Sequence, residues 1–176
     1  SPDRLSEELA TFSGNVISWI SERYADPVPR DAVRKMCAEL YFGTEESPGL
    51  YRLETPMLRS HWEELGIPVG VYTGRNLAEW DLAKITLGWQ DFPDDRIIHS
   101  DTGIHKPSPE GLELLSKRLG CSAPVFLGDT GSDMKAQAAF GRGYFVAIGN
   151  LLPEADYIYD DTESAVREII SLIEEG

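Results

Sequence analysis

The stretch VFLGDTGSDMKAQAAFG, residues 125–141, decides the fold of this chain. An apolar run, Val125–Leu127, ends at Gly128, and small residues from Ala136 onward open a helical pattern. A buried parallel strand, a tight turn and a helix produce this pattern. Ligands of such sheets bind beyond the carboxyl ends of the strands. The stretch therefore predicts an α/β fold with a binding site directly after this strand.

Two carboxylates follow the strand. Asp129 comes directly after Gly128, and Asp133 lies four residues further on. Carboxylate oxygens suit a hard cation such as Mg²⁺, which often bridges to phosphate. The alternative is that the aspartates only cap the following helix. The stretch alone leaves both interpretations open.

A second apolar strand is expected in VGVYTGRN, residues 69–76. It ends in Thr73, Gly74 and Arg75. A hydroxyl and backbone N–H groups at a strand end can hold a phosphate oxygen, and the start of the following helix favours an anion. A strand-end hydroxyl with no ligand is the alternative for Thr73.

A lysine lies between these two strands in the sequence. Lys106 is followed by Pro107 and Pro109, which fix the backbone before a helix that begins near Glu110. A lysine anchored in this way can present its ammonium group to a dianion. The alternative is an ordinary solvated lysine.

The order of these segments resembles the haloacid dehalogenase superfamily of phosphohydrolases, from about Leu53 to the C-terminus. In this comparison Thr73 is similar to the second motif, Lys106 to the third, and Asp129 with Asp133 to the fourth. The resemblance implies a doubly wound parallel sheet of the Rossmann-like type with a small helical cap, as in subfamily I phosphatases.

The resemblance also implies a function, a Mg²⁺-dependent phosphatase that hydrolyses a small phosphorylated metabolite through an aspartyl-phosphate intermediate. Asp129 and Asp133 would be the metal ligands. Alternatively, Asp133 would orient Lys106. Lys106, Thr73 and Asp133 would serve in catalysis. Instead of binding phosphate, Arg75 could form an ion pair with a surface carboxylate. The phosphate would be bound by Thr73, Gly74, Arg75 and Lys106.

One motif of the superfamily is missing. The first strand should end in Asp-x-Asp, whose first aspartate is the nucleophile, yet no Asp-x-Asp occurs in the 176 residues. That strand would lie between the strands ending at Thr73 and Gly128, so its loss would leave backbone groups unpaired. We therefore expect the nucleophile upstream of Ser1. The rival is that another element, residues 14–20, fills the central slot.

Apolar residues at helical spacing predict helices before the second motif, and the resemblance implies that residues 1–49 are all or part of the helical cap and residues 50–176 the α/β core. The alternative is that the first helices pack directly on the sheet. Helices are expected at 6–24, 31–42, 55–65, 77–87, 109–119, 134–140 and 163–173, and strands at 69–72, 96–99, 125–127, 144–148 and 157–159.

The composition of the chain limits the classes of molecule that it is expected to bind. The formal net charge of -14 argues against nucleic acid and anionic membranes as partners. No apolar run reaches the ~20 residues that span a bilayer. Cys37 and Cys121 lie far apart without zinc or redox spacing, which favours free thiols in the cytoplasm. The oligomeric state is open, with a homodimer as one option.

Other functions remain in competition with the phosphatase. A phosphomutase or a phosphonate hydrolase could use the same scaffold. A dehalogenase fits less well, because those members need no metal and the Gly128-Asp129 pair favours one. A non-catalytic binding module would explain the missing nucleophile. The sequence does not name the substrate.

Overall fold

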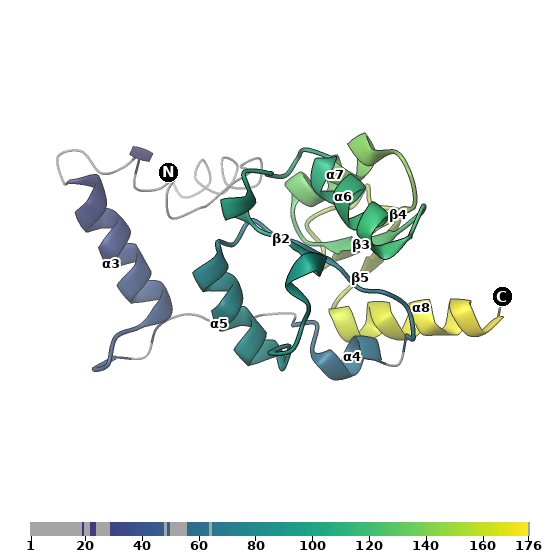
Figure 1. Ribbon diagram of the computed structural model, residues 1–176, viewed down its shortest axis with the longest axis horizontal. Helices are drawn as coiled ribbons and strands as arrows, with labels where there is room; N and C mark the ends of the chain where they lie inside the picture. The colour runs from purple at the N-terminus through teal and green to yellow at the C-terminus, as the bar shows by residue number, and fades with distance from the viewer. Residues whose placement is uncertain are drawn as a thin grey trace. The chain divides into compact units, whose positions relative to one another are not determined.

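A computed structural model of the chain describes residues 19, 22–23, 29–47, 49, 56–63 and 65–175. The described residues belong to two compact units, divided after Glu54, and each unit is described by itself (Figure 1). The helix predicted over residues 6–24 lies almost entirely outside the described residues. The division into a cap, residues 1–49, and a core, residues 50–176, stays a prediction.

The smaller unit contains helix α3 (Arg30–Phe42), close to the predicted range of 31–42. The helix ends at Gly43, whose φ of 86° lies in the left-handed region that favours glycine. Val33 is the buried residue of this helix, whereas Met36 and Leu40 are exposed.

The larger unit contains parallel strands in two sheets. In the first, β1 (Val71–Tyr72) pairs with β2 (Ile97–Ile98). In the second, the order is β3 (Val125–Gly128), β4 (Tyr144–Ile148) and β5 (Tyr157–Tyr159). All pairs are parallel, which confirms the predicted α/β class.

Helices alternate with these strands. They are α4 (Arg59–Glu63), α5 (Leu77–Leu87), α6 (Glu110–Leu119), α7 (Gly131–Phe140) and α8 (Thr162–Glu175). Two short 3₁₀ segments, η1 (Asp94–Arg96) and η2 (Ser100–Thr102), flank β2. Helix α5 has the predicted bounds, whereas the described helix α4 is shorter than the predicted 55–65.

Alternating side chains place helices on both faces of the first sheet. Tyr72 and Ile98 pack in one cluster with Leu112 of α6. Ile97, which points to the other face, packs with Trp80 of α5. Successive side chains of a strand point to opposite faces, so α5 and α6 lie on opposite sides.

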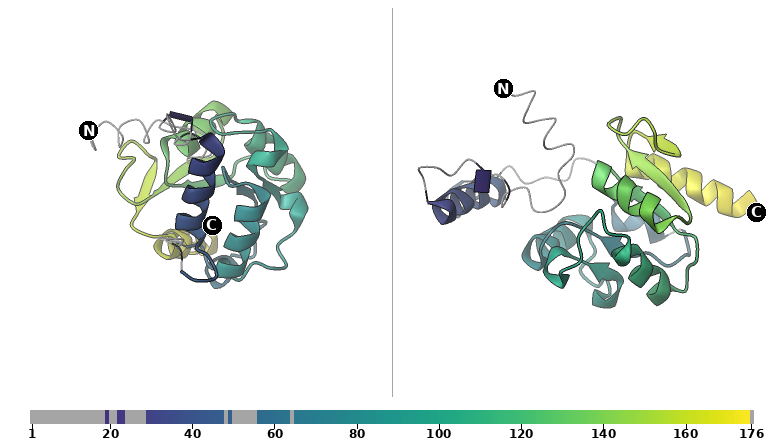
Figure 2. Two further views of the ribbon diagram at one scale, coloured as in Figure 1. Left: turned by 90° about the vertical axis from the view of Figure 1, so that its left-hand side faces the viewer. Right: turned by 90° about the horizontal axis from the view of Figure 1, so that it is seen from above.

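The second sheet is covered in the same way. Phe145 of β4 packs with Met134 of α7, and the next residue, Val146, packs with Ala165 of α8. Figure 2 shows the green α7 and the yellow α8 on either side of these strands. The larger unit is therefore doubly wound, as predicted.

The sheet of the larger unit is interrupted. Among the described residues β1 pairs only with β2, and β3 pairs only with β4 along its length. The two sheets nevertheless share a core cluster, in which Tyr72, Leu112 and Phe140 are buried and Phe126 packs against them. The strand that the resemblance implies between the two sheets stays a prediction.

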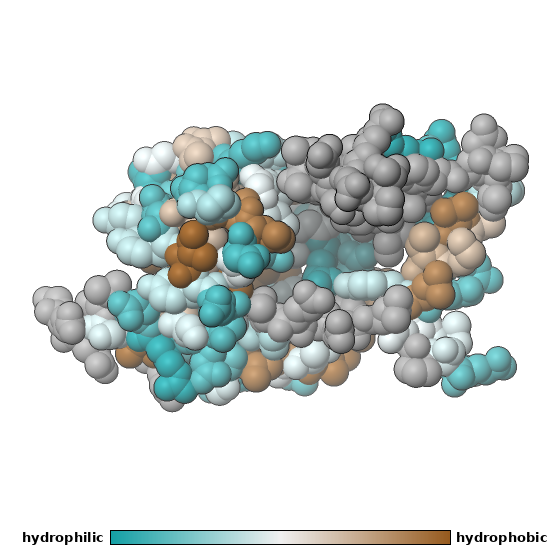
Figure 3. Space-filling model, turned by 180° about the vertical axis from the view of Figure 1, so that it is seen from behind, coloured by the Kyte–Doolittle hydropathy of each residue, from teal (hydrophilic) through white to brown (hydrophobic). Residues whose placement is uncertain are grey.

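The surface of the protein includes both hydrophilic and hydrophobic residues. On the face shown in Figure 3, hydrophobic residues form small groups among hydrophilic ones. None of the helices in the described part of the chain is long and apolar enough to cross a membrane.

Candidate active site

The candidate site lies where β1 and β3 end. Thr73 directly follows β1, and its N–H donates to the carbonyl of Ile98 at 2.9 Å, which continues the ladder with β2. Asp129 directly follows β3. Both residues therefore occupy the carboxyl ends of parallel strands, where α/β proteins bind their ligands.

An ion pair joins the third and fourth segments that the sequence singled out. The Lys106 Nζ atom donates to Asp133 Oδ1 at 2.5 Å, although 27 residues separate the two in sequence. The side chain of Lys106 is 16% exposed and that of Asp133 only 4%. A charge-assisted hydrogen bond with little access to water fixes the ammonium group in one position.

The other oxygen of Asp133 is also occupied. Asp133 Oδ2 accepts from the Thr130 N–H at 3.0 Å and from the Thr130 hydroxyl at 2.5 Å. In return the Thr130 hydroxyl accepts from the Asp133 N–H at 3.3 Å. This reciprocal capping box starts α7 at Gly131, earlier than the predicted Met134.

Asp133 therefore has two structural roles, because it caps α7 and contacts Lys106. Protein donors occupy both of its oxygens, which favours the orienting role over direct metal ligation. Its role as a metal ligand stays a prediction. Gly128 makes room for this carboxylate, because a Cβ atom at Gly128 would lie 2.6 Å from the Cβ atom of Asp133.

Asp129 is an exposed residue at the rim of the site. Partial burial of the carboxyl group raises its pKa, and the negative charge of Asp133 adds to the rise. The positive charges of Lys106 and Arg75 act in the opposite direction. The structure therefore brings Asp129, Asp133, Lys106 and Arg75 into one electrostatic neighbourhood.

Thr73 is linked to the same neighbourhood through the backbone. Its Oγ1 atom accepts from the Arg75 N–H at 3.1 Å, which leaves the hydroxyl hydrogen to reach another acceptor. The helix that follows offers less to an anion than the sequence suggested. Its first N–H group, that of Leu77, donates to Asp101 at 2.9 Å, and Asn76 forms a capping box with Glu79.

A magnesium ion would find an oxygen donor here. Mg²⁺ is usually bound by one or two carboxylates, with water and substrate phosphate as its remaining ligands. Asp129, an exposed carboxylate directly after β3, fits one of these positions. The described residues contain no group of three or more His, Cys, Asp or Glu that could hold a metal ion.

Sequence reasoning missed the part played by Thr130. A threonine followed three residues later by an acidic residue, at the start of a helical run, is a capping-box signal. The pattern Thr130-Gly-Ser-Asp133 carries that signal. It would have predicted the earlier helix start and the engagement of Asp133.

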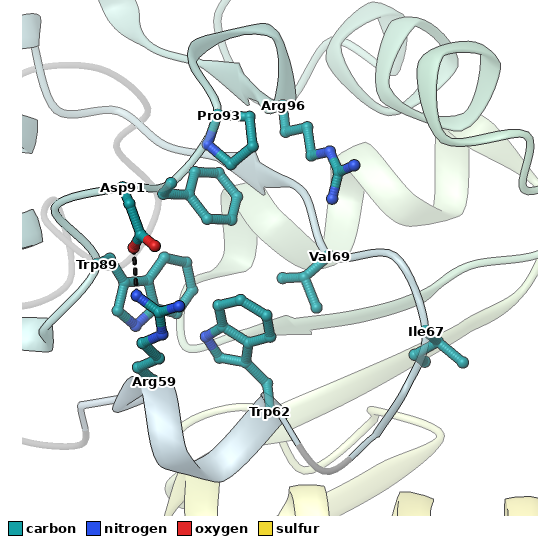
Figure 4. Close-up of a pocket in the computed structure, with 9 residues that line it drawn as sticks. Arg59, Trp62, Ile67, Val69, Trp89, Asp91, Pro93 and Arg96 are labelled. Atoms are coloured by element: carbon teal, nitrogen blue, oxygen red, sulfur yellow. Dashed lines mark hydrogen bonds and ion pairs between the residues drawn. The ribbon is translucent and has the colours of Figure 1, made fainter.

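A separate hollow of about 180 Å³ lies at the amino ends of β1 and β2, where Val69 and Arg96 precede the strands (Figure 4). Figure 4 shows Arg59 directed at Asp91, beside the rings of Trp62 and Trp89. Arg59 also pairs with Glu63. The hollow is lined by Arg59, Trp62, Ile67, Val69, Trp89, Asp91, Phe92, Pro93 and Arg96.

The hollow and the rim at the carboxyl ends of the strands differ in the chemical groups that could take part in a reaction. The hollow has mainly aromatic and aliphatic walls, and its Arg59 is already paired with carboxylates. The rim at the carboxyl ends combines acidic, basic and hydroxyl groups from separate segments. We therefore regard the rim as the candidate active site.

Comparison with known proteins agrees with the sequence resemblance. A family model described as a hydrolase, haloacid dehalogenase-like hydrolase, matches residues 21–141, more than half of the chain. The matched range includes Thr73, Lys106, Asp129 and Asp133. No curated protein matches the chain.

Proposed function

We propose, since the chain belongs to the haloacid dehalogenase-like hydrolases, that this hydrolase is a Mg²⁺-dependent phosphatase that acts on a small phosphorylated metabolite. One observation carries the proposal: the Lys106–Asp133 pair, with a contact of 2.5 Å, beside Asp129 at the strand ends. An ammonium group fixed next to a carboxylate that can hold a metal suits a dianionic substrate.

The positive groups have a clear task in this proposal. A protein with a formal net charge of -14 repels a phosphate ester at long range, so attraction must be local. Lys106 would neutralise the oxygens of the phosphoryl group, and Asp133 keeps its ammonium group in place. Thr73 would donate its hydroxyl hydrogen to a phosphate oxygen. The charge of Arg75 would add to the attraction.

Asp129 would hold the metal. When bound there, Mg²⁺ would neutralise charge on the phosphate and align it with the attacking group. The magnesium site is part of the proposal, supported by the position of the Asp129 carboxyl group at the carboxyl end of β3.

The nucleophile is proposed to be the first aspartate of an Asp-x-Asp motif on a strand expected upstream of Ser1. Its carboxylate would attack phosphorus, the bond to the leaving oxygen would break, and the second aspartate of the motif would give that oxygen a proton. Water then hydrolyses the aspartyl-phosphate. Support comes from β1 and β3, each of which pairs on one side only among the described residues.

The test uses the full-length protein and p-nitrophenyl phosphate, with release of free phosphate as the readout. We expect hydrolysis with Mg²⁺ and its loss with EDTA. Asp129→Asn should lower kcat/KM by about 10²-fold or more, because a centre of charge neutralisation is removed. Asp91→Asn, at the opposite end of the strands, is the matched control and should retain activity.

Other outcomes would point to the competing functions. Metal-independent hydrolysis, or full activity of Asp129→Asn, would contradict the proposal. An isomerised phosphate ester as product would indicate a phosphomutase. Phosphate binding without turnover would favour a non-catalytic module, the reading supported by the absence of Asp-x-Asp from these 176 residues.

A further inference from the structure

Tyr72, the last residue of β1, contacts the segment that carries Lys106. Its side chain is buried, with 5% exposed, and its hydroxyl donates to the carbonyl of Ser108 at 3.0 Å. Helix α6 approaches the ring closely at Gly111, where a Cβ atom would lie 2.5 Å from the ring. Glycine at position 111 therefore lets the helix pack directly against the tyrosine.

The same ring faces the ammonium group of Lys106. Lys106 Nζ lies 5.8 Å from the centroid of the Tyr72 ring, within the range of a cation–π contact. Asp133 contacts this ammonium group at 2.5 Å. The ammonium group is thus held between a carboxylate and an aromatic ring.

The loop around Lys106 has few backbone donors with which to fix itself. Pro107 and Pro109 lack an N–H group, and the Ser108 N–H donates to the carbonyl of His105 at 2.9 Å. The phenol of Tyr72 supplies the bond at the Ser108 carbonyl. A phenylalanine would fill the same space but leave that partly buried carbonyl without this donor.

We propose that Tyr72 is a positioning residue for Lys106, whose hydroxyl fixes the Ser108 end of the lysine loop and whose ring supports the ammonium group. The consequence for catalysis rests on the proposed phosphatase function, whereas the positioning itself does not. Burial raises the pKa of Tyr72 to about 12, helped by the charges of Glu110 and Asp133, so the phenol remains a donor at neutral pH.

The first test is spectroscopic and independent of activity. NMR of the labelled full-length protein follows the Lys106 side chain and the Ser108 carbonyl carbon. Tyr72→Phe should shift the Ser108 carbonyl signal and broaden the Lys106 signals. Tyr72→Leu should also remove the ring-current shift of the lysine methylenes. Tyr144→Phe, which changes an exposed tyrosine at the start of β4, is the matched control and should alter neither.

The second test is a double-mutant cycle with p-nitrophenyl phosphate. Tyr72→Phe keeps the ring and should lower kcat by about threefold to tenfold, the effect of one lost hydrogen bond, with little change in KM. In a Lys106→Ala background the same substitution should have almost no effect, because a positioning residue acts through its partner.

Two results would overturn the inference. One is an equal loss of kcat in both backgrounds, which would indicate a general structural effect. The other is a set of Lys106 and Ser108 signals that is the same in Tyr72→Phe as in the wild type. If Tyr72→Leu does not fold, Tyr72→Phe carries the test. If the wild type hydrolyses no phosphate ester, the proposed function fails, and the NMR result still decides the inference.

Discussion

Two ion pairs of a basic residue with aspartate lie at opposite ends of the strands, in different surroundings. At the carboxyl ends the side chains of Lys106 and Asp133 are 16% and 4% exposed. At the amino ends those of Arg59 and Asp91 are 41% and 67% exposed. Water can replace the partner of an exposed charge but not that of a buried one. The burial of an ion pair, more than its presence, therefore distinguishes the candidate site from the rest of the surface.

The largest effect should come from breaking the buried pair. Lys106→Met leaves the Asp133 carboxylate buried without its cation. We expect the free energy of unfolding to fall by about 3 kcal/mol, measured by urea denaturation. The matched variant Arg59→Met removes the exposed cation and should change the unfolding transition little, because water solvates Asp91 in its place.

Equal losses in the two variants would break the comparison. A double variant that adds Asp133→Asn to Lys106→Met removes the unpaired buried charge. Recovery of stability in this double variant would support the difference between the buried and the exposed pair.

The next effect concerns the room made for Asp133. Gly128→Ala places a methyl group 2.6 Å from Asp133 Cβ and 2.8 Å from its Cγ atom. The carboxylate must then shift, which disturbs its contact with Lys106. We expect a loss of about 1–3 kcal/mol in the free energy of unfolding, as for overpacked cores. The Lys106 signals in NMR should move as well. A variant with unchanged stability and unchanged signals would contradict this account.

The smallest effect is a pH dependence at the rim. Burial, with the charge of Asp133, raises the pKa of Asp129, so the ionised carboxyl group disfavours the folded state. Its contribution to stability is present below the unfolded pKa of about 3.9 and is lost as the pH rises through the folded pKa. Metal-free Asp129→Asn should therefore melt above the wild type at neutral pH, with the difference disappearing in acid.

Thermal unfolding followed by circular dichroism checks this expectation. Mg²⁺ should raise the melting temperature of the wild type and not that of Asp129→Asn, because binding to the folded state stabilises it. Asp91→Asn, which removes a partner of Arg59, should show no gain at neutral pH. A lower melting temperature for Asp129→Asn throughout the pH range would contradict the sign of the effect.

Local signals were sufficient for much of the fold. Helix α5 has the predicted bounds because Asn76 caps its start and Gly88, with φ 73°, ends it. Strands β4 and β5 also have the predicted bounds, since short apolar runs lie between turn residues. The start of α7 was predicted too late, because the capping box of Thr130 had not been recognised.

The site was less predictable, because its contacts join distant segments. The orienting role of Asp133 was one of two alternatives, and only the fold shows its contact with Lys106. Tyr72 carried no signal of its own, since a buried aromatic residue at the end of a strand looks like an ordinary core residue. The carboxyl end of β3 was predictable because ligands of parallel sheets bind there.

The engagement of Asp133 at both oxygens ties the beginning of a helix to the ammonium group at the rim. This shared carboxylate links the Lys106 loop to the first turn of α7. Fraying of that turn would release the lysine at the same moment. On heating, the ammonium group of Lys106 should therefore lose its fixed position when this turn opens, before the core of the sheet unfolds.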